Sequence, residues 1–304
     1  MAEYSIYKLK FQTAVHFGNG MLNASVPTFC ADTLFSALFI EAIKSGYEED
    51  LLQATKQGRL KISDALPYSE ELFFVPVPKI RIRRAEEGNS AEKKKFKAMK
   101  YLPVEKLNDF LYGTMAPNNK LADAFRLSTR TMASVNGQEE TLPYQVGVCT
   151  YKNNSGLYVI AETGSDEEQM LFGELLDAVS KVGIGGKRSA GLGRFEVSIG
   201  KKGTEELIKR LHADSDRKML LSVALPREDE LAHALEDASY DVIQRSGFVS
   251  SETFADEQRK KKALFVLDAG SCFKNAFSGD VYDVSRGGGK HPVYRYAVPM
   301  FLAV

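Results

Sequence analysis

Three features that often reveal a protein's class are scarce in this sequence: cysteine, long apolar runs and an excess of charge of one sign. The three cysteines, Cys30, Cys149 and Cys272, are far apart and form no C-x-x-C pair, which argues against a disulfide framework and a structural zinc site. No apolar run approaches the ~20 residues of a membrane span. The first residues lack the basic and apolar regions of a signal peptide. We therefore expect a cytoplasmic protein with no membrane partner and no bound metal.

The net charge is zero, with 40 Lys and Arg residues against 40 Asp and Glu residues, which at first sight argues against a nucleic-acid partner. The charges are segregated, however. Residues 79–100 carry nine cations against three Glu, residues 181–202 carry six against one acid, and residues 285–295 carry three cations and a histidine with no acid. Because a polyanion needs only a local positive stripe, nucleic-acid binding stays open, and the acidic segments are available to protein partners.

The apolar spacing predicts the elements of the first 78 residues. Alternation from Ile6 to Phe11 is typical of a half-buried strand. Asp32 is placed to cap an amphipathic helix that Gly46 closes. The run from Phe73 to Val77 predicts a short edge strand, because the prolines in and after it cannot serve a central ladder.

Residues 79–130 are basic and weakly periodic, and we expect them to form a partly mobile insertion. Beyond them, strands are predicted over 144–151 and 157–161. A capping box at Ser165 then opens a helix, and a strand is predicted over 195–199.

Together these patterns predict an α+β protein of two tandem ferredoxin-like (RRM-like) domains with a glycine-rich loop and a basic insertion. Residues 1–200 give the order strand, helix, strand, strand, helix, strand of the split β-α-β fold, with insertions at about 47–72 and 79–130. Residues 201–216 are the expected linker. Residues 217–304 hold a sparser second copy, with strands expected at 219–225, 263–268 and 293–298 and a helix at 231–246.

The segment from Gly183 to Arg194 is the strongest local signal for function. It holds five glycines and, at Lys187, Arg188 and Arg194, three cations. Glycines let backbone N–H groups converge into an anion-binding nest, and arginine can bind a phosphate with two hydrogen bonds. A P-loop would require Ser or Thr where Arg188 stands. A dinucleotide fingerprint would follow a strand, whereas this loop follows a predicted helix. Polyanion binding and a plain glycine-rich turn remain open.

The same segment, Gly-Ile-Gly-Gly-Lys-Arg-Ser-Ala-Gly-Leu-Gly-Arg-Phe, resembles the glycine-rich loop of the RAMP superfamily of CRISPR proteins. Two further motifs, Ala-Asp-Thr-Leu-Phe-Ser-Ala-Leu from residue 31 and Gly-Gly-Gly-Lys-His-Pro-Val-Tyr-Arg-Tyr from residue 287, are similar to motifs of its type III-A branch. Within that branch the chain resembles the fourth subunit of the Csm effector complex, which is related to the Cas-five group.

The resemblance implies a ribonucleoprotein subunit of antiviral defence that has no catalytic residues and no cofactor. Such a subunit binds the 5′ handle of the crRNA, caps that end of the complex and bridges the large signature subunit to the first backbone RAMP subunit. It also carries a β-hairpin thumb that interrupts pairing with the target RNA near the guide 5′ end. The hairpin that Asn136-Gly137 predicts in this sequence suits that thumb.

We predict RNA contacts in five segments, and several have a structural alternative. The loop after the first strand and the following helix start offer a histidine, hydroxyls and free N–H groups. Alternating cations after the edge strand would form one face of a basic strand, or only a solvated edge. A side chain of the hairpin could insert between bases, or the hairpin could only pack within the protein. The C-terminal glycine run suits binding of single-stranded RNA, or it is a plain connector. The predicted RNA-binding residues are His16, Gly18, Asn19, Thr33, Ser36, Lys79, Arg81, Arg83, Arg130, Thr131, Met132, Gly185, Gly186, Lys187, Arg188, Ser189, Gly191, Arg286, Lys290, His291, Tyr294 and Arg295.

His16 also carries an alternative function. Imidazole titrates near neutral pH, and related processing endonucleases often use a histidine early in the chain. The second hypothesis is therefore a metal-independent endoribonuclease that cuts repeat RNA with His16 as general base, although no tyrosine and lysine stand beside it in the sequence. A nucleotide-dependent small-molecule enzyme is the third hypothesis, which the context of the glycine-rich loop disfavours.

Overall fold

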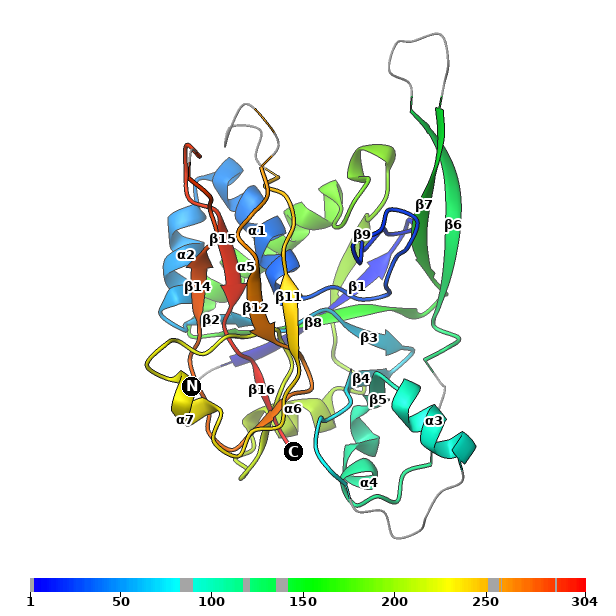
Figure 1. The fold of residues 1–304 in the computed structure, drawn as a ribbon, viewed down its shortest axis with the longest axis vertical. Coiled ribbons are helices and arrows are strands. Elements are labelled where there is room, and N and C mark those ends of the chain that lie inside the picture. The colour runs from blue at the N-terminus through cyan, green and yellow to red at the C-terminus, as the bar shows by residue number, and fades with distance from the viewer. Residues whose placement is uncertain are drawn as a thin grey trace.

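The computed structural model describes residues 3–82, 90–116, 121–134, 142–250, 257, 259–287 and 289–304, with side chains except at 90–93 and 134. The fold is mixed α/β, and a long hairpin projects from one side of the body (Figure 1). Every strand pairing among the described residues is antiparallel.

A seven-stranded sheet organises the N-terminal half. Its strands follow the order β5-β4-β3-β8-β1-β9, and β2 also pairs with β8. Because β1 and β9 are neighbours and antiparallel, the loop that leaves β1 lies beside the loop that enters β9. The strands are β1 (Glu3–Phe11), β2 (Leu60–Ile62), β3 (Leu66–Ser69), β4 (Leu72–Pro76), β5 (Tyr101–Pro103), β8 (Ser155–Thr163) and β9 (Phe195–Ile199).

Helices cover both faces of this sheet. The face that includes Leu9 and Val159 shares a core with α1 and α5, and the face that includes Ile6 and Tyr158 shares another with α4 and α6. As a result β8 is buried along nearly its whole length, without the alternation of a sheet that is solvated on one side. The helices are α1 (Ala31–Ser45), α2 (Glu48–Lys56), α3 (Ser90–Ala98), α4 (Leu107–Leu111), α5 (Asp166–Val182), α6 (Glu205–His212) and α7 (Leu231–Ala234), with 3-10 turns at Val104–Lys106 and Arg188–Ala190.

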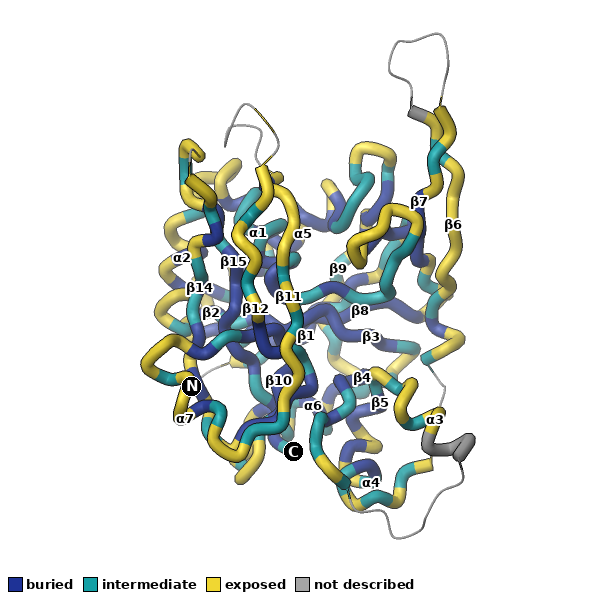
Figure 2. Tube along the Cα trace, in the orientation of Figure 1, coloured by how far each residue is buried: buried dark blue, intermediate teal, exposed yellow. Residues whose placement is uncertain are grey.

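The C-terminal part consists of short strands that pack on the N-terminal half. The Tyr296 hydroxyl donates to the Ile62 carbonyl (3.1 Å) and accepts the Ile62 N–H (2.8 Å), and its ring lies 5.5 Å from the Phe35 ring of α1. Figure 2 shows buried segments of both parts meeting in the middle of the molecule. The strands are β10 (Lys218–Leu220), β11 (Val242–Arg245), β12 (Leu264–Leu267), β13 (Cys272–Phe273), β14 (Asp280–Asp283), β15 (Tyr294–Ala297) and β16 (Phe301–Ala303), in the pairings β13-β10-β16, β11-β12 and β14-β15.

The predicted hairpin is confirmed. Its strands β6 (Phe125–Ser134) and β7 (Leu142–Tyr151) pair in register over their whole length and project beyond the body (Figure 1). Its base is fixed to the loop after β1, because Val15 and Cys149 exchange two backbone hydrogen bonds of 2.8 Å. The turn at Asn136-Gly137 lies outside the described residues.

Two segments predicted as insertions belong to the folded body. Residues 47–72 form α2, β2 and β3, and β3 pairs directly with β8. Residues 101–111 form β5 and α4, and Leu102 is fully buried, so the prediction of a partly mobile insertion is wrong there. The edge-strand prediction for 73–77 is also wrong, because β4 lies between β3 and β5. Pro76 is tolerated as the last residue of that strand.

The helix predicted over 231–246 is wrong for most of its length. Only Leu231–Ala234 is helical, Asp237 takes a φ of +54°, and the chain continues as β11. The apolar spacing fits a helix, but pairing with β12 decides in favour of extended backbone. The strands predicted at 263–268 and 293–298 are confirmed as β12 and β15.

Candidate nucleic-acid interface

The glycine-rich loop lies directly against the segment that follows β1. The Gly186 N–H donates to the His16 carbonyl at 2.9 Å, and the Gly193 N–H donates to the Ala14 carbonyl at 2.9 Å. The loop also closes on itself, because the Ile184 N–H donates to the Gly193 carbonyl at 3.0 Å. The two segments therefore form one hydrogen-bonded unit at the end of the main sheet.

Contact with His16 requires glycine at two positions of the loop. Gly185 has a φ of +98°, and a Cβ there would stand 2.7 Å from the His16 carbonyl oxygen. A Cβ on Gly186 would stand 2.7 Å from Cδ2 of the His16 ring. Gly191 has a φ of +81° but open space around it. Gly185 and Gly186 thus allow contact with His16, whereas Gly191 only permits a turn.

His16 is buried against the hairpin. Its Nδ1 lies 2.6 Å from the Gly147 carbonyl oxygen of β7. Because a carbonyl oxygen only accepts, Nδ1 carries the proton, and Nε2 is the acceptor of the neutral ring. A Cβ on Gly18 would stand 3.3 Å from this Nε2. The histidine therefore joins three segments and keeps one acceptor nitrogen beside Gly18.

Lys187 connects the loop to the hairpin. Its Nζ donates to the Tyr144 hydroxyl at 3.1 Å and lies 4.5 Å from the centre of that ring. Arg188 is half-buried and forms no ion pair with a described residue, and Ser189 is exposed. Of the loop's predicted cationic ligands, Arg188 is thus the one that bonds to no described side chain.

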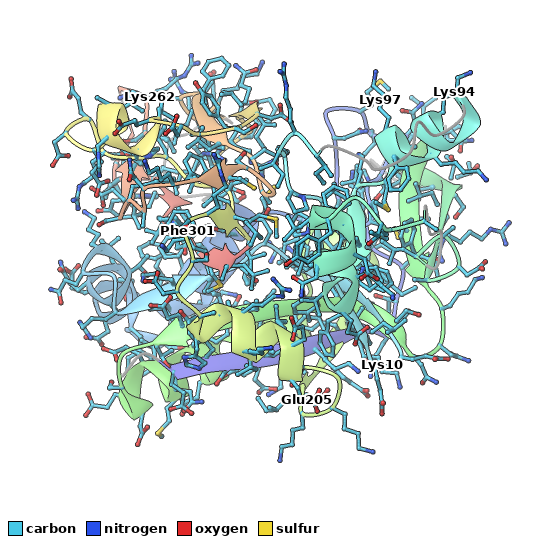
Figure 3. The ribbon with its side chains drawn as sticks, turned by 90° about the horizontal axis from the view of Figure 1, so that it is seen from below. Lys10, Lys94, Lys97, Glu205, Lys262 and Phe301 are labelled. Atoms are coloured by element: carbon cyan, nitrogen blue, oxygen red, sulfur yellow. The ribbon has the colours of Figure 1, made fainter. Side chains whose placement is uncertain are left out.

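A cleft of about 870 Å³ lies beside the loop. Aromatic rings and lysines from the 79–101 segment also line it, and Figure 3 labels one of these lysines, Lys97, on α3. The Tyr101 hydroxyl and the Thr28 hydroxyl share a hydrogen bond of 3.0 Å in that lining. Seven predicted RNA-binding residues line this one cleft: His16, Gly18, Asn19, Thr33, Lys79, Gly185 and Gly186.

A second, smaller cavity of about 220 Å³ adjoins the cleft. Thr33, Gly185 and Arg245 line both. The smaller cavity also gathers Ser36, Arg188 and Arg295, three predicted residues from α1, the glycine-rich loop and β15. The predicted contacts from distant parts of the chain therefore converge on two connected spaces.

Asp32 does not cap α1, which corrects the sequence prediction. It is the second residue of the helix, and Cys30 holds the N-cap position without a side-chain bond. Arg245 donates to both carboxylate oxygens (2.9 and 2.7 Å), and Arg295 donates to one of them. Burial alone would raise the pKa of Asp32, but the two arginines outweigh it, so the pKa lies below its usual value.

Asp64 satisfies the helix start instead. One of its carboxylate oxygens accepts the Ala31 N–H (2.7 Å) and the Val223 N–H (3.0 Å). Asp64 thereby joins α1 to the C-terminal part. Burial raises its pKa to about 7, against the lowering effect of these two hydrogen bonds.

The basic stripe predicted over residues 79–83 does not form. Residues 77–82 are not a strand. Lys79 pairs with Asp268 (2.7 Å) and Asp241 (3.2 Å), so its charge is already matched although it lines the cleft. Arg81 is exposed and lines neither cavity, and Arg83 lies outside the described residues.

The predicted hairpin residues lie away from both cavities. Arg130 and Thr131 are exposed on β6, where the Thr131 hydroxyl accepts Gln145 Nε2 at 3.0 Å. Met132 is half-buried and packs against a small apolar cluster that includes Val146. In this conformation Met132 packs against Val146 and the neighbouring loops rather than projecting as a wedge.

The predicted C-terminal residues divide into two groups. Arg286, Lys290 and His291 lie between β14 and β15 and line neither cavity. Tyr294 packs edge-on against Phe39 of α1, with ring centres 5.5 Å apart, and lines neither cavity. Arg295, one residue later on the strand, is the residue of this segment that reaches the site.

Sequence reasoning missed Arg245, Lys261 and Asp64. The first two line the smaller cavity, and Asp64 and Arg245 line the cleft. Arg245 belongs to a segment predicted as helical, so its side-chain direction could not be read. Among the described residues, no group of three or more His, Cys, Asp or Glu residues is placed to hold a metal ion, and none of the helices is long and apolar enough for a membrane crossing.

Comparisons with known proteins agree with the motif resemblance. A RAMP superfamily model matches residues 8–196, and a model for the CRISPR Csm4 C-terminal domain matches residues 213–304. A protein named CRISPR system Cms protein Csm4 from Mycobacterium tuberculosis (strain ATCC 25618 / H37Rv) is 36% identical over 293 residues, covering 95% of this chain and 94% of that protein. One of the same name from Streptococcus thermophilus is 33% identical over 305 residues, covering 98% of each.

Solved structures share the fold. The Csm3-Csm4 subcomplex of the type III-A CRISPR-Cas interference complex gives a TM-score of 0.66 at 20% identity, covering 99% of each chain. A Csm1-Csm4 cassette in complex with pppApA gives 0.62 at 18% identity, covering 99% of this chain and 98% of that one. With both parts of the sequence matched by family models, the chain belongs to the RAMP superfamily and, within it, to the Csm4 family.

Proposed function

We propose that this chain is a non-catalytic subunit of a type III-A CRISPR effector complex that binds the 5′ handle of the crRNA in the larger cleft. The observation that carries the proposal is the convergence of seven predicted residues from four segments on that cleft. Its wall combines lysines with aromatic rings. Cations that follow phosphates and rings that stack on bases are the usual means of holding unpaired RNA.

Membership of the Csm4 family supports the proposed protein partners. The solved relatives are paired with Csm3 in one structure and with Csm1 in another. On this basis we infer that the chain bridges the large signature subunit and a backbone RAMP subunit. The projecting hairpin, with Arg130 and Thr131 exposed, would face the target RNA near the guide 5′ end. Such a complex would work in the cytoplasm.

The division into two ferredoxin-like domains is part of the proposal. In the N-terminal half, β1, α1, β3, β8, α5 and β9 follow the order of the split β-α-β unit, and the spatial order β3-β8-β1-β9 supports it. Residues 217–304 form shorter strands in three small sheets, so the support is weaker there. We keep the boundaries 1–200 and 217–304, with residues 201–216, which contain α6, between them.

The endonuclease alternative has less support. Nδ1 of His16 already bonds to Gly147, and no described tyrosine or lysine bonds to His16. We therefore propose that His16 holds the loops together and contacts RNA, and that it is not a general base. Repeat RNA that is cut by the purified chain, with cutting lost in His16→Ala, would reverse this assignment.

Binding of handle-sequence RNA tests the main proposal. Neutralising Lys187 and Arg188 together as Lys187→Gln/Arg188→Gln should weaken binding about tenfold or more, because a hydrogen bond to a charged group contributes roughly 1.5–3 kcal/mol. The plot of log K against log salt should also become less steep by one to two units, which fluorescence anisotropy at several salt concentrations measures.

The matched control removes two charges elsewhere. Lys201 and Lys202 are exposed beyond β9 and line neither cavity, so Lys201→Gln/Lys202→Gln should change the affinity much less. Equal losses in the two double variants would mean that only the overall charge matters. Full affinity in Lys187→Gln/Arg188→Gln would remove the glycine-rich loop from the proposed site.

A further inference from the structure

The smaller cavity carries charge that its own side chains do not neutralise. Four cations line it, Arg188, Arg245, Lys261 and Arg295, against one carboxylate, Asp32. Asp32 is already bonded to both Arg245 and Arg295. Neither Arg188 nor Lys261 forms an ion pair with a described residue. Four cations against one acid leave an excess of three positive charges among the described lining residues.

This excess is partly withdrawn from water. Arg295 is 5% exposed, and its Nε has no hydrogen-bond partner. Burial, and next the charge of Arg295, lower the pKa of Lys261. Charges that are buried without a partner are costly, and the usual remedy is a counter-charge bound at the same place. A bound anion would supply that counter-charge.

The position and size of the cavity indicate which anion. Thr33, Gly185 and Arg245 line both the cavity and the larger cleft. An RNA strand bound in the cleft would therefore pass the opening of the cavity. Its volume of about 220 Å³ is below the roughly 300–1,000 Å³ of pockets that enclose whole small molecules. The space suits a single charged group of a longer chain.

We propose that this cavity binds one phosphate group of the guide RNA, with Arg188 and Lys261 as direct ligands. The guanidinium groups of Arg245 and Arg295, held by Asp32, provide fixed positive charge around it. The identity of the RNA rests on the proposed function, whereas the anion site does not. A phosphate fixed beside the glycine-rich loop would set the register of the nucleotides on either side.

Neutralising RNA phosphates one at a time tests the site in the full chain. The probe is handle-sequence RNA with a single uncharged methylphosphonate linkage placed at each position in turn. With the unmodified protein, one linkage should weaken binding about tenfold and the others about two- to threefold. In the Lys261→Gln variant, neutralising that same linkage should weaken binding no more than neutralising any other linkage. Lys262→Gln, at the exposed neighbouring position labelled in Figure 3, should keep the original profile.

Thermal unfolding without RNA separates this site from the proposed function. Millimolar inorganic phosphate should raise the unfolding temperature of the unmodified protein and of Lys262→Gln, compared with chloride at equal ionic strength. It should not raise that of Lys261→Gln or Arg188→Gln. Without phosphate, Lys261→Gln should unfold at a higher temperature than the unmodified protein, because it removes an unneutralised charge. If Lys261 only supported the fold, Lys261→Gln would instead unfold at a lower temperature than the unmodified protein.

The outcomes distinguish the two proposals. If RNA does not bind but phosphate stabilises the protein in a Lys261-dependent way, the anion site stands and the proposed function falls. If RNA binds, no linkage depends on Lys261 and phosphate has no effect, the anion site is overturned and the proposed function stands.

Discussion

The glycine-rich loop and the arginine cluster, which we define as Asp32, Arg245 and Arg295, line the same interface but are built in different ways. The loop is continuous in sequence, and its shape comes from backbone bonds and from glycines that touch His16. The cluster joins α1, β11 and β15 through hydrogen-bonded ion pairs between side chains. A change in the loop should therefore act by steric strain, whereas a change in the cluster should act by leaving charge unpaired.

The largest expected effect is in the arginine cluster. Asp32→Ala leaves two guanidinium groups without their carboxylate, and one of them, Arg295, is 5% exposed. Breaking such a buried pair from one side typically costs about 3–5 kcal/mol of the free energy of unfolding, which urea denaturation measures. Asp177→Ala is the control, because its ion pair with Lys181 lies on the exposed side of α5 and should contribute under about 0.5 kcal/mol. Similar losses in both variants would contradict the electrostatic account of the cluster.

The loop should respond to the size of the side chain. Gly185→Ala adds a methyl group where 2.7 Å separates the new Cβ from the His16 carbonyl oxygen, at a φ of +98°. Left-handed strain and overpacking together should cost about 2–4 kcal/mol of unfolding free energy. Gly191→Ala has comparable φ but open space, so it should cost only about 1–2 kcal/mol. The difference between the two variants isolates the contact with His16, and a difference of zero would mean that the loop adjusts freely.

The same contrast explains what could be predicted from the sequence. The loop can be picked out from the sequence because its glycines and cations are adjacent in the chain, and its neighbours His16 and Gly18 follow the strand beside it. The strand β1 and the helix α5 also follow from local periodicity, because each has a long regular pattern, and the hairpin follows from the turn signal at Asn136-Gly137.

The arginine cluster could not be predicted in this way. The apolar spacing around Arg245 fits a helix, and only the pairing of β11 with β12 shows that the chain is extended and brings the arginine to Asp32. The cap prediction for Asp32 failed for a related reason. Asp64, which is 32 residues away in sequence, supplies the acceptor at the helix start and leaves Asp32 for the arginines. Tertiary contacts, which leave no local periodicity, decide both cases.

Asp64 allows a smaller test of the comparison, because it is a buried acid beside the arginine cluster that has backbone partners but no ion pair among the described residues. Its pKa in the folded protein is about 7, raised mainly by burial above an unfolded value near 4. For an acid with a raised pKa, the favourable contribution is present below the unfolded pKa and is lost as pH rises through the folded pKa. Relative to Asp64→Asn, the unmodified protein should therefore lose about 2–3 kcal/mol of unfolding free energy between pH 5 and pH 8.

Asparagine keeps an oxygen that can accept the Ala31 and Val223 N–H groups, so Asp64→Asn removes the titration and leaves the geometry. Asp32 does not disturb the comparison, because its lowered pKa places its titration below this pH range in both proteins. Urea denaturation at several pH values gives the difference directly. If the unfolding free energy depends on pH in the same way in the two proteins, the Asp64 carboxylate is stabilised in the folded protein to the same extent as the Asp32 carboxylate. In that case the positive charge of Arg245 and Arg295 would extend beyond its own cluster to the start of α1.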